Sequence, residues 1–177
     1  FINGDSCRAC HFEPFIGGSG PLGVNVMRYG DLDDDGAFVT PPGGTALAKF
    51  GVHGPRPEAP LAMITEARQT PMLFGIGILD LLAPENIIAN ADPNDSNGDG
   101  IAGVAHILPD GRLGRFGWKA QVPSLADFMR DALGEEMGVT VPSQAGMTFG
   151  KTTDNDEIAD PEMSAEDINT MFFFASQ

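Results

Sequence analysis

The feature that most constrains this chain is the sequence CRACH at residues 7–11, where two cysteines and a histidine share one short turn. A CxxCH sequence is the attachment site of a c-type haem. One helical turn presents both thiols to the porphyrin, and the histidine that follows reaches the iron. Cys7, Cys10 and His11 therefore predict a covalently bound haem c, with His11 as an iron ligand.

Three other uses of these residues stay open: a redox-active dithiol, a disulfide and half of a zinc site. A thioredoxin-like dithiol should follow a strand, which the preceding FINGDS does not resemble. A zinc site needs two further ligands, and because there are no more cysteines only His53 and His106 could serve. Haem c is the favoured interpretation. Since haem is attached in this way outside the cytoplasm, we expect a periplasmic or otherwise extracytoplasmic location.

The charge of the chain limits its partners. Lys and Arg total 10 against 25 Asp and Glu, a formal net charge of -15. Such a charge repels nucleic acid and favours cationic or metal partners, although it also serves solubility alone. No apolar run is long enough to cross a bilayer, so we expect no membrane span. The sequence starts at Phe1 without a leader, and we expect a mature or partial chain.

The 23 Gly and 14 Pro recur along the whole chain and predict long ordered loops between a few short helices. We expect a mainly α fold with long Gly/Pro-rich loops and little sheet. The CxxCH sequence lies on a short helix near residues 5–12, and loops follow to about Pro60. Pro71 and Pro84 suit the first turns of two more short helices.

Two later helices have clearer signals. Residues 124–136 combine Ser124 as N-cap, Asp127 at the capping-box position and apolar residues on one face, and Gly138 ends the helix. The last helix begins at Ser164, has acidic residues in its first turn and continues to the end of the chain.

The segments around these motifs resemble a known family. They are SCRACHFEPFIGGSGP, ARQTPMLFGIGILDLL, ADPNDSNGDGIAG, and GRFGWKAQVPSLADFM followed by GEEMG. They are similar to the di-haem oxidoreductases, which are related to bacterial di-haem cytochrome c peroxidases and to the MauG-type enzymes, and they cover most of residues 1–138. The resemblance implies a cytochrome c-like domain housing the peroxide-reacting haem. Residues 1–177 are then one c-type haem domain, either the N-terminal half of a longer di-haem protein or one subunit of a split one.

The resemblance also implies roles for single residues. Trp118 in FGWKA corresponds to the family's tryptophan between the haems, and Glu136 in GEEMG to a distal-side glutamate that moves protons during peroxide cleavage. A buried carboxylate with a raised pKa can do this. Taken without the resemblance, Trp118 is more ordinarily a packing residue and Glu136 an exposed one. Phe128 stands where the family has a glutamine, which leaves the distal hydrogen bonding in doubt.

The sixth position of the iron has several candidate ligands. Met27 lies in the region where related peroxidases place a removable ligand, while His53, His106 and the other methionines are also available. Each methionine is more ordinarily a core or haem-wall residue, and structural roles are the default for both histidines.

Two acidic segments predict calcium. They read DxDxDG and DxNxDG, the first half of a calcium loop, but neither has Glu at the twelfth position. The alternative is a pair of solvated Asx turns. The candidate ligands are Asp31, Asp33, Asp35, Asp95, Asn97 and Asp99.

Two functions compete. The first is the peroxide-reacting domain of a di-haem oxidoreductase, which receives electrons from a second haem domain or haem-bearing chain and acts on hydrogen peroxide or a small substrate. The family's second CxxCH is missing from these 177 residues, so peroxidase activity is not assigned to them in isolation. The alternative is a mono-haem electron-transfer cytochrome subunit that docks to a redox partner protein. A haem-based sensor is a third, weaker possibility.

Overall fold

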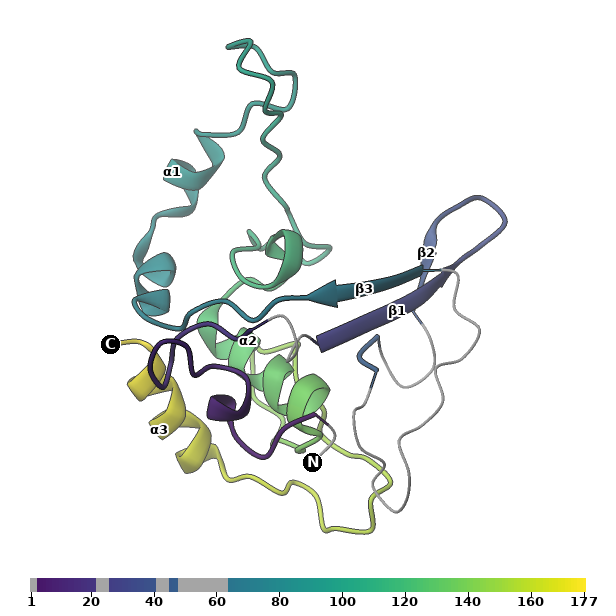
Figure 1. The fold of residues 1–177 in the computed structure, drawn as a ribbon, viewed down its shortest axis with the longest axis vertical. Helices are drawn as coiled ribbons and strands as arrows, with labels where there is room; N and C mark the ends of the chain where they lie inside the picture. The colour runs from purple at the N-terminus through teal and green to yellow at the C-terminus, as the bar shows by residue number, and fades with distance from the viewer. Residues whose placement is uncertain (1–2, 22–25, 41–44, 48–63) are drawn as a thin grey trace.

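The computed structural model describes residues 3–21, 26–40, 45–47 and 64–177. In the described residues, a small sheet lies to one side of the short helices α1, α2 and α3, and long loops connect the elements (Figure 1). The elements are η1 (Cys7–Ala9), β1 (Val26–Leu32), β2 (Phe38–Val39), β3 (Ile64–Arg68), η3 (Ile76–Leu81), α1 (Pro84–Ile88), η4 (Trp118–Ala120), α2 (Leu125–Ala132), η5 (Leu133–Met137) and α3 (Ala165–Ala175).

The prediction of a mainly α fold with little sheet is wrong. Strands β2, β1 and β3 form an antiparallel sheet in that order. The longest pairing joins β1 to β3, from Val26 opposite Arg68 to Gly30 opposite Ile64. Part of the region predicted as loop is therefore strand, and this sheet carries charged residues that matter for the site.

The two later helices are confirmed. Ser124 caps α2 and accepts a hydrogen bond from the backbone N–H of Asp127. The helix continues into η5, a π-helical turn that ends at Gly138 in the left-handed conformation, with φ of 70°. Ser164 caps α3 in the same way, through the backbone N–H of Asp167. Capping side chains and terminal glycine thus fixed both ends of the α2–η5 helix.

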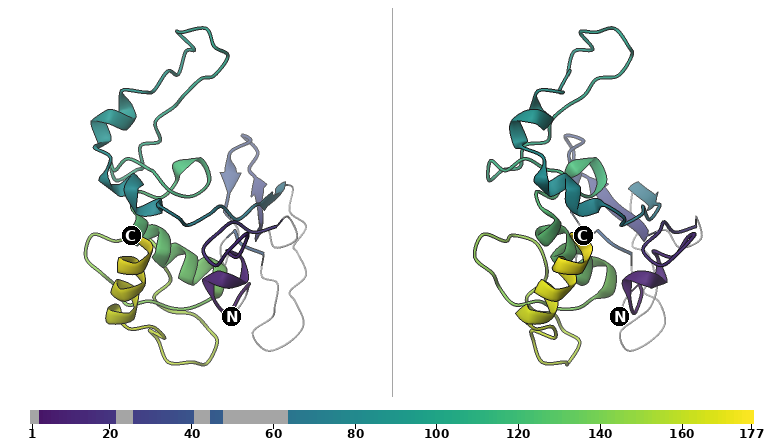
Figure 2. Two further views of the ribbon diagram at one scale, coloured as in Figure 1. Left: turned by 60° about the vertical axis from the view of Figure 1, so that its left-hand side comes forward. Right: turned by 90° about the vertical axis from the view of Figure 1, so that its left-hand side faces the viewer.

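The predictions for the shorter helices are only partly right. Pro84 occupies the first turn of α1, as expected. Pro71 does not start a helix, because it lies in extended chain before η3. The loop that follows α1 projects away from the other helices in every view (Figure 1, Figure 2). Within the described residues, none of the helices is both long and apolar enough to cross a membrane.

Two small apolar clusters hold the helices together. One joins Phe116, Val122 and Leu125, and the other joins Leu133, Val141 and Ile168. Because Leu125 and Leu133 lie on α2 and η5, this helix links the two clusters, and α3 packs against it through Ile168. Burial of such side chains supplies most of the stability of a small fold.

The contact between η3 and the end of α3 leaves no room for a side chain at Gly77. A Cβ there would overlap the backbone of Ser176. We expect Gly77→Ala to lower the free energy of unfolding by about 1–3 kcal/mol, since overpacking displaces backbone. Urea unfolding checks this. Gly103→Ala is the control, because its Cβ would lie 3.5 Å from the nearest heavy atom. Equal losses in both variants would contradict the expected overlap.

Candidate haem site

The CxxCH sequence forms one tight turn. Cys7 begins η1 and its carbonyl accepts hydrogen bonds from the backbone N–H groups of Cys10 and His11, at 3.2 and 2.9 Å. The two cysteines are not joined in a disulfide; Cys7 is exposed and Cys10 is half-buried. The turn therefore holds two cysteines outside any disulfide, as thioether attachment of a c-type haem requires.

The side chain of His11 is fixed by a partner sixty residues further along the chain. Its Nδ1–H donates to the carbonyl oxygen of Pro71 at 2.8 Å. A carbonyl can only accept, so this bond assigns the proton to Nδ1 and leaves the lone pair on Nε2. Burial, opposed by the hydrogen bond to Pro71, lowers the pKa of His11 and favours the neutral imidazole. Metal-binding histidines are oriented in this way, with the second ring nitrogen on a carbonyl or carboxylate.

Large apolar side chains lie exposed on both segments that meet at this hydrogen bond. Phe15 and Ile16 follow His11 and are 73% and 70% exposed, while Met72 and Phe74 follow Pro71 and are 59% and 55% exposed. The backbone N–H of Leu73 donates to the carbonyl of Gly17 at 2.8 Å and keeps the segments together. Exposed apolar side chains beside a histidine held in this tautomer suit the face of a porphyrin. The residues present therefore fit a covalently attached haem.

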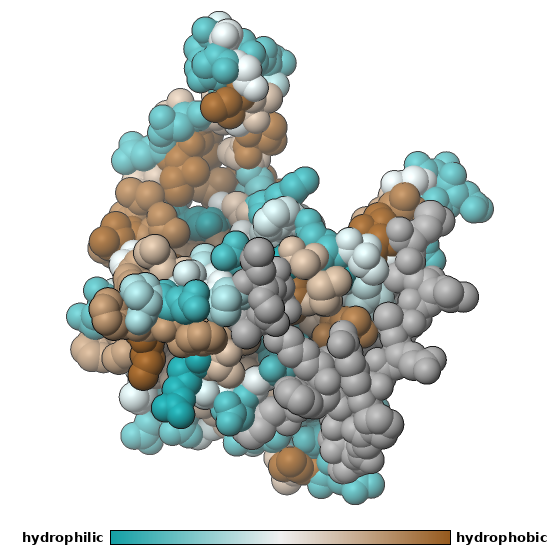
Figure 3. Space-filling model, viewed as in Figure 1, coloured by the Kyte–Doolittle hydropathy of each residue, from teal (hydrophilic) through white to brown (hydrophobic). Residues whose placement is uncertain are grey.

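Further apolar side chains extend this surface. Figure 3 shows hydrophobic residues gathered over η3 and α1. The exposed ones include Ile78, Leu79, Leu81, Leu82 and Ile88. Neighbouring exposed apolar side chains of this kind can mark a binding site for a protein or a cofactor.

Trp118 begins η4 and is about half exposed. The guanidinium carbon of Arg68 lies 5.3 Å from the centre of its ring, a cation–π contact. Arg68 ends β3 only three residues before Pro71, at most about 10 Å along the extended chain. One short segment thus contacts both the histidine of the CxxCH turn and Trp118.

Glu136 lies in η5 and is paired with an arginine of the sheet. Its Oε1 lies 2.8 Å from Nη2 of Arg28, which is largely buried in β1. The Nη1 of Arg28 donates to Oγ1 of Thr45 at 3.1 Å. The expectation of a carboxylate held inside the protein is met only in part, because the side chain of Glu136 is 32% exposed.

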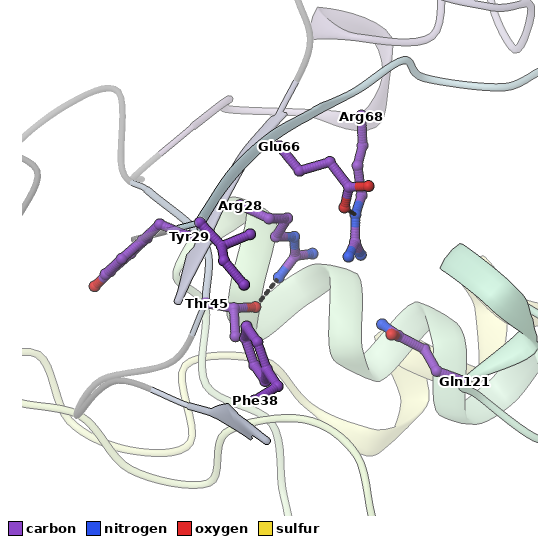
Figure 4. A pocket seen from close by; sticks show the side chains of 8 residues that line it. Arg28, Tyr29, Phe38, Thr45, Glu66, Arg68 and Gln121 are labelled. Carbon is purple, nitrogen blue, oxygen red and sulfur yellow. Dashed lines mark hydrogen bonds and ion pairs between the residues drawn. The ribbon is translucent and has the colours of Figure 1, made fainter. Parts of the chain in front are cut away.

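The pairing of β1 with β3 brings the arginine that contacts Trp118 close to the arginine that pairs with Glu136. Arg28 lies directly opposite Glu66 in the β1–β3 register, and Oε2 of Glu66 accepts from Nε of Arg68 at 2.8 Å. Figure 4 shows Arg28, Glu66 and Arg68 around one small pocket, with Gln121 across from them. The residues that the resemblance singled out, Trp118 and Glu136, are therefore each held by an arginine of neighbouring strands.

This pocket has a volume of about 120 Å³, room for a few waters or a very small molecule. It is too small for a haem, since cofactor pockets measure about 300–1,000 Å³. Its lining residues are Arg28, Tyr29, Phe38, Thr45, Ile64, Glu66, Arg68 and Gln121.

A larger open hollow of about 850 Å³ lies beside η4, and His106 lies at its wall. The ring Nδ1 of His106 bonds the carbonyl of Lys119 at 3.0 Å, the same kind of contact that His11 makes, and its structural or ligand role stays a prediction. His53, the other candidate, lies outside the described residues.

The sequence predicted a loop at Met27, but Met27 is the second residue of strand β1. It is half-buried and pairs with Ala67 of β3, and its carbonyl accepts from the backbone N–H of Leu47. Its role as sixth iron ligand stays a prediction.

The first predicted calcium loop forms the turn between β1 and β2. The Oδ1 of Asp33 accepts the backbone N–H groups of Asp35 and Ala37, at 3.1 and 2.8 Å, and Asp31 bonds the N–H of Leu32. These are the contacts of an Asx turn, the alternative that the sequence left open.

The second loop is similar. Asp95 accepts the N–H of Gly100, Asn97 that of Asp99, and Asp99 that of Ile101. Calcium in either loop stays a prediction.

A third acidic group was not predicted from the sequence. Asp154, Asp156 and Glu162 bring one carboxylate oxygen each within 4.8 Å of one another. Glu162 also accepts the backbone N–H and the hydroxyl of Thr140. The spacing of the three residues matches no metal motif, so only the folded loop reveals the group.

The arginines of the sheet were also missed. The signal available was weak: the segment ITEAR places Glu66 and Arg68 two residues apart, on one face of any strand. Comparison with protein-family models, with curated proteins and with solved structures returned no match. The likeness to di-haem oxidoreductases therefore stays a prediction from the motifs.

Proposed function

We propose that residues 1–177 are a c-type haem domain with the role of the peroxide-reacting domain of a di-haem oxidoreductase. Cys7 and Cys10 attach the haem and His11 is its iron ligand. The observation that carries the proposal is the hydrogen bond from His11 Nδ1 to Pro71, because it fixes the imidazole in the tautomer that binds a metal through Nε2. Covalent attachment of this kind also supports an extracytoplasmic location.

Haem iron, when bound, supplies the redox chemistry of peroxide cleavage. The chain's own contribution is proton transfer by Glu136, which takes a proton from one peroxide oxygen and returns it to the other. The ion pair with Arg28 fixes the orientation of the Glu136 carboxylate. Thr45 in turn fixes Arg28. These two contacts together hold the Glu136 carboxylate in one orientation through both proton transfers.

Trp118 lies on the proposed route of electrons from a second haem. The positive charge of Arg68 above its ring opposes loss of an electron from the indole, because it repels the resulting cation. Glu66 offsets this charge through its 2.8 Å ion pair with Arg68. The three residues together therefore set how readily Trp118 gives up an electron.

A mono-haem electron-transfer subunit is the second candidate. The net charge of -15 favours it, since acidic cytochromes of this kind associate with basic partners by electrostatic steering. The two candidates differ in one property: an electron carrier needs no reaction with peroxide.

The reaction with peroxide tests Glu136. In the haem-loaded protein we expect Glu136→Gln to slow the reaction about 100-fold, because an amide cannot move protons. Stopped-flow absorbance of the haem measures the rate constant. Glu135→Gln is the matched control: it is the adjacent residue and pairs instead with Lys151 at 3.3 Å. An unchanged rate in Glu136→Gln, or the same loss in both variants, would remove Glu136 from the catalytic role.

A further inference from the structure

The pocket of about 120 Å³ beside the sheet brings two arginines together (Figure 4). Arg28 of β1 lies opposite Glu66 of β3, and Arg68 follows Glu66 by two positions, so the three side chains project from the same face of the strand pair. The side chains of Arg28 and Arg68 are 11% and 24% exposed. Both guanidinium charges therefore lie largely out of water, at the wall of a cavity.

The two guanidinium groups carry more N–H donors than the described residues around them use. Each has five such donors and no acceptor. Arg28 donates from Nη1 to Thr45 at 3.1 Å and from Nη2 to Glu136 at 2.8 Å, while its buried Nε has no hydrogen-bond partner within the described residues. Arg68 donates to Glu66 from Nε at 2.8 Å, which leaves the N–H donors of its two Nη groups for another acceptor. A ligand with two acceptor oxygens would meet unused donors here.

The charged side chains that line the pocket leave one positive charge in excess. They are Arg28, Arg68 and Glu66, two cations against one anion. Glu136, which pairs with Arg28, does not line the pocket and is 32% exposed, so solvent screens part of its charge. The excess is a local exception in a chain whose formal net charge is -15. The pocket therefore favours a ligand with one negative charge.

The size and shape of the pocket limit that ligand to a few heavy atoms. A volume of about 120 Å³ corresponds to about four waters, since one water has a share of about 30 Å³ in the liquid. Phe38 and Ile64 make part of the wall apolar, and the side-chain amide of Gln121 lies across from the arginines (Figure 4). The forked donors of a guanidinium match two oxygens of a planar anion. Formate and nitrate have this shape, charge and size.

We propose that this pocket binds a small planar monoanion, a carboxylate or an inorganic oxyanion of the nitrate type. The Nη groups of Arg68 donate to its oxygens, Gln121 adds its amide N–H, and Arg28 contributes its charge from the neighbouring strand. The inference goes beyond the proposed function, because binding needs neither haem nor peroxide. The guanidinium carbon of Arg68 lies 5.3 Å from the ring centre of Trp118, so an anion that pairs with Arg68 changes the surroundings of the chain's only tryptophan.

Titration of the full chain with sodium formate tests the site. The ferrous protein is kept under carbon monoxide, so that an open iron position cannot take the anion. Formate replaces the bulky sulfonate MES, which is too large for the pocket, at constant ionic strength. The indole N–H of Trp118 gives a single resonance in a proton–nitrogen correlation spectrum. We expect formate to shift this resonance saturably with a Kd of about 1–10 mM, since a ligand of so few atoms makes few contacts.

Sodium nitrate, titrated in the same way, distinguishes the two sources of the anion. A saturable shift with both salts assigns the pocket to planar monoanions in general, and a shift with formate alone assigns it to carboxylates. Absence of a saturable shift with either salt would overturn the proposal. A chain that carries no haem can be titrated identically, so failure of the proposed function leaves this test intact.

Arg68→Met tests the ligand contacts, because it removes the donors and keeps an apolar side chain of similar length. We expect the affinity for formate to fall about tenfold or more. The side-chain amide resonance of Gln121 reports it, since the variant also changes the surroundings of Trp118. Arg68→Lys keeps the charge without the fork and should lose less. Arg8→Met is the matched control: it removes the same charge from the exposed CxxCH turn and should bind formate like the wild type. Wild-type affinity in Arg68→Met, or an equal loss in Arg8→Met, would overturn the proposal.

Discussion

Replacing Cys10 by Ser is expected to lower the yield of covalently bound haem to a small fraction of the wild-type yield. The variant leaves a single thiol in the CxxCH turn, and Ser cannot form a thioether bond. Expression with cytochrome c maturation proteins, followed by mass spectrometry of the denatured protein, gives the fraction that carries haem. Cys7→Ser should behave alike, since both sulfurs lie on the same turn.

The matched control is Arg8→Ala, an exposed residue between the two cysteines. This substitution changes a side chain of the same turn and leaves both cysteines in place. We therefore expect Arg8→Ala to keep covalent haem at the wild-type level. Normal yield of covalent haem in Cys10→Ser would contradict the assignment of the attachment site.

Asp127→Ala is expected to lower the free energy of unfolding by about 2–3 kcal/mol, because hydrogen bonds to a charged group contribute about 1.5–3 kcal/mol and a buried carboxylate is removed. Its side chain is fully buried and accepts from three groups. Oδ2 lies 2.8 Å from Nη1 of Arg112 and 2.9 Å from the hydroxyl of Ser124, and Oδ1 accepts the backbone N–H of Thr148 at 3.1 Å. Alanine would remove the acceptor that the guanidinium of Arg112, the hydroxyl of Ser124 and the backbone N–H of Thr148 share. Urea unfolding measures the loss.

Asp110→Ala is the control for this variant, because Asp110 pairs with the same arginine, Arg112, but is exposed at the surface. Surface ion pairs contribute little to stability, so its loss should be far smaller. Equal destabilisation in the two variants would show that burial of Asp127 is not what matters.

Local signals predicted the helices better than the sheet. Ser124 and Ser164 are N-caps that act within three residues, so their helices could be found from the sequence. Strand β1 lacks the alternation of apolar and polar residues that marks a half-buried strand, because its sequence VMRYGDL puts Arg28 and Gly30 on the same face as Val26. Its partner β3 lies more than thirty residues away, and only the folded chain reveals the pairing.

The candidate site likewise contains some residues that local sequence signals indicated and others that only the folded chain reveals. Spacing alone indicated Cys7, Cys10 and His11, because attachment of haem fixes that spacing. Pro71 was assigned to a helix by its local preference, yet its carbonyl bonds His11 across sixty residues. The arginines that hold Trp118 and Glu136 depend on the sheet register, which no local pattern predicts.

The raised pKa of Asp131, a residue of α2, could not be predicted from the sequence either. Asp131 resembles any other acidic residue on the polar face of a helix, and its raised pKa depends on burial in the folded protein. The two cations that pair with its neighbours come from β1 and from the loop at Lys151. Titration behaviour of this kind is a property of the fold.

The most direct test of the central claim is the electron paramagnetic resonance spectrum of the ferric, haem-loaded protein before and after addition of hydrogen peroxide. A c-type haem with His11 as ligand and an iron position open to peroxide predicts a high-spin signal that peroxide changes. A low-spin signal that peroxide leaves unchanged would contradict the peroxide-reacting role and favour the electron-transfer subunit. Absence of covalent haem from protein matured under these conditions would contradict the haem site itself.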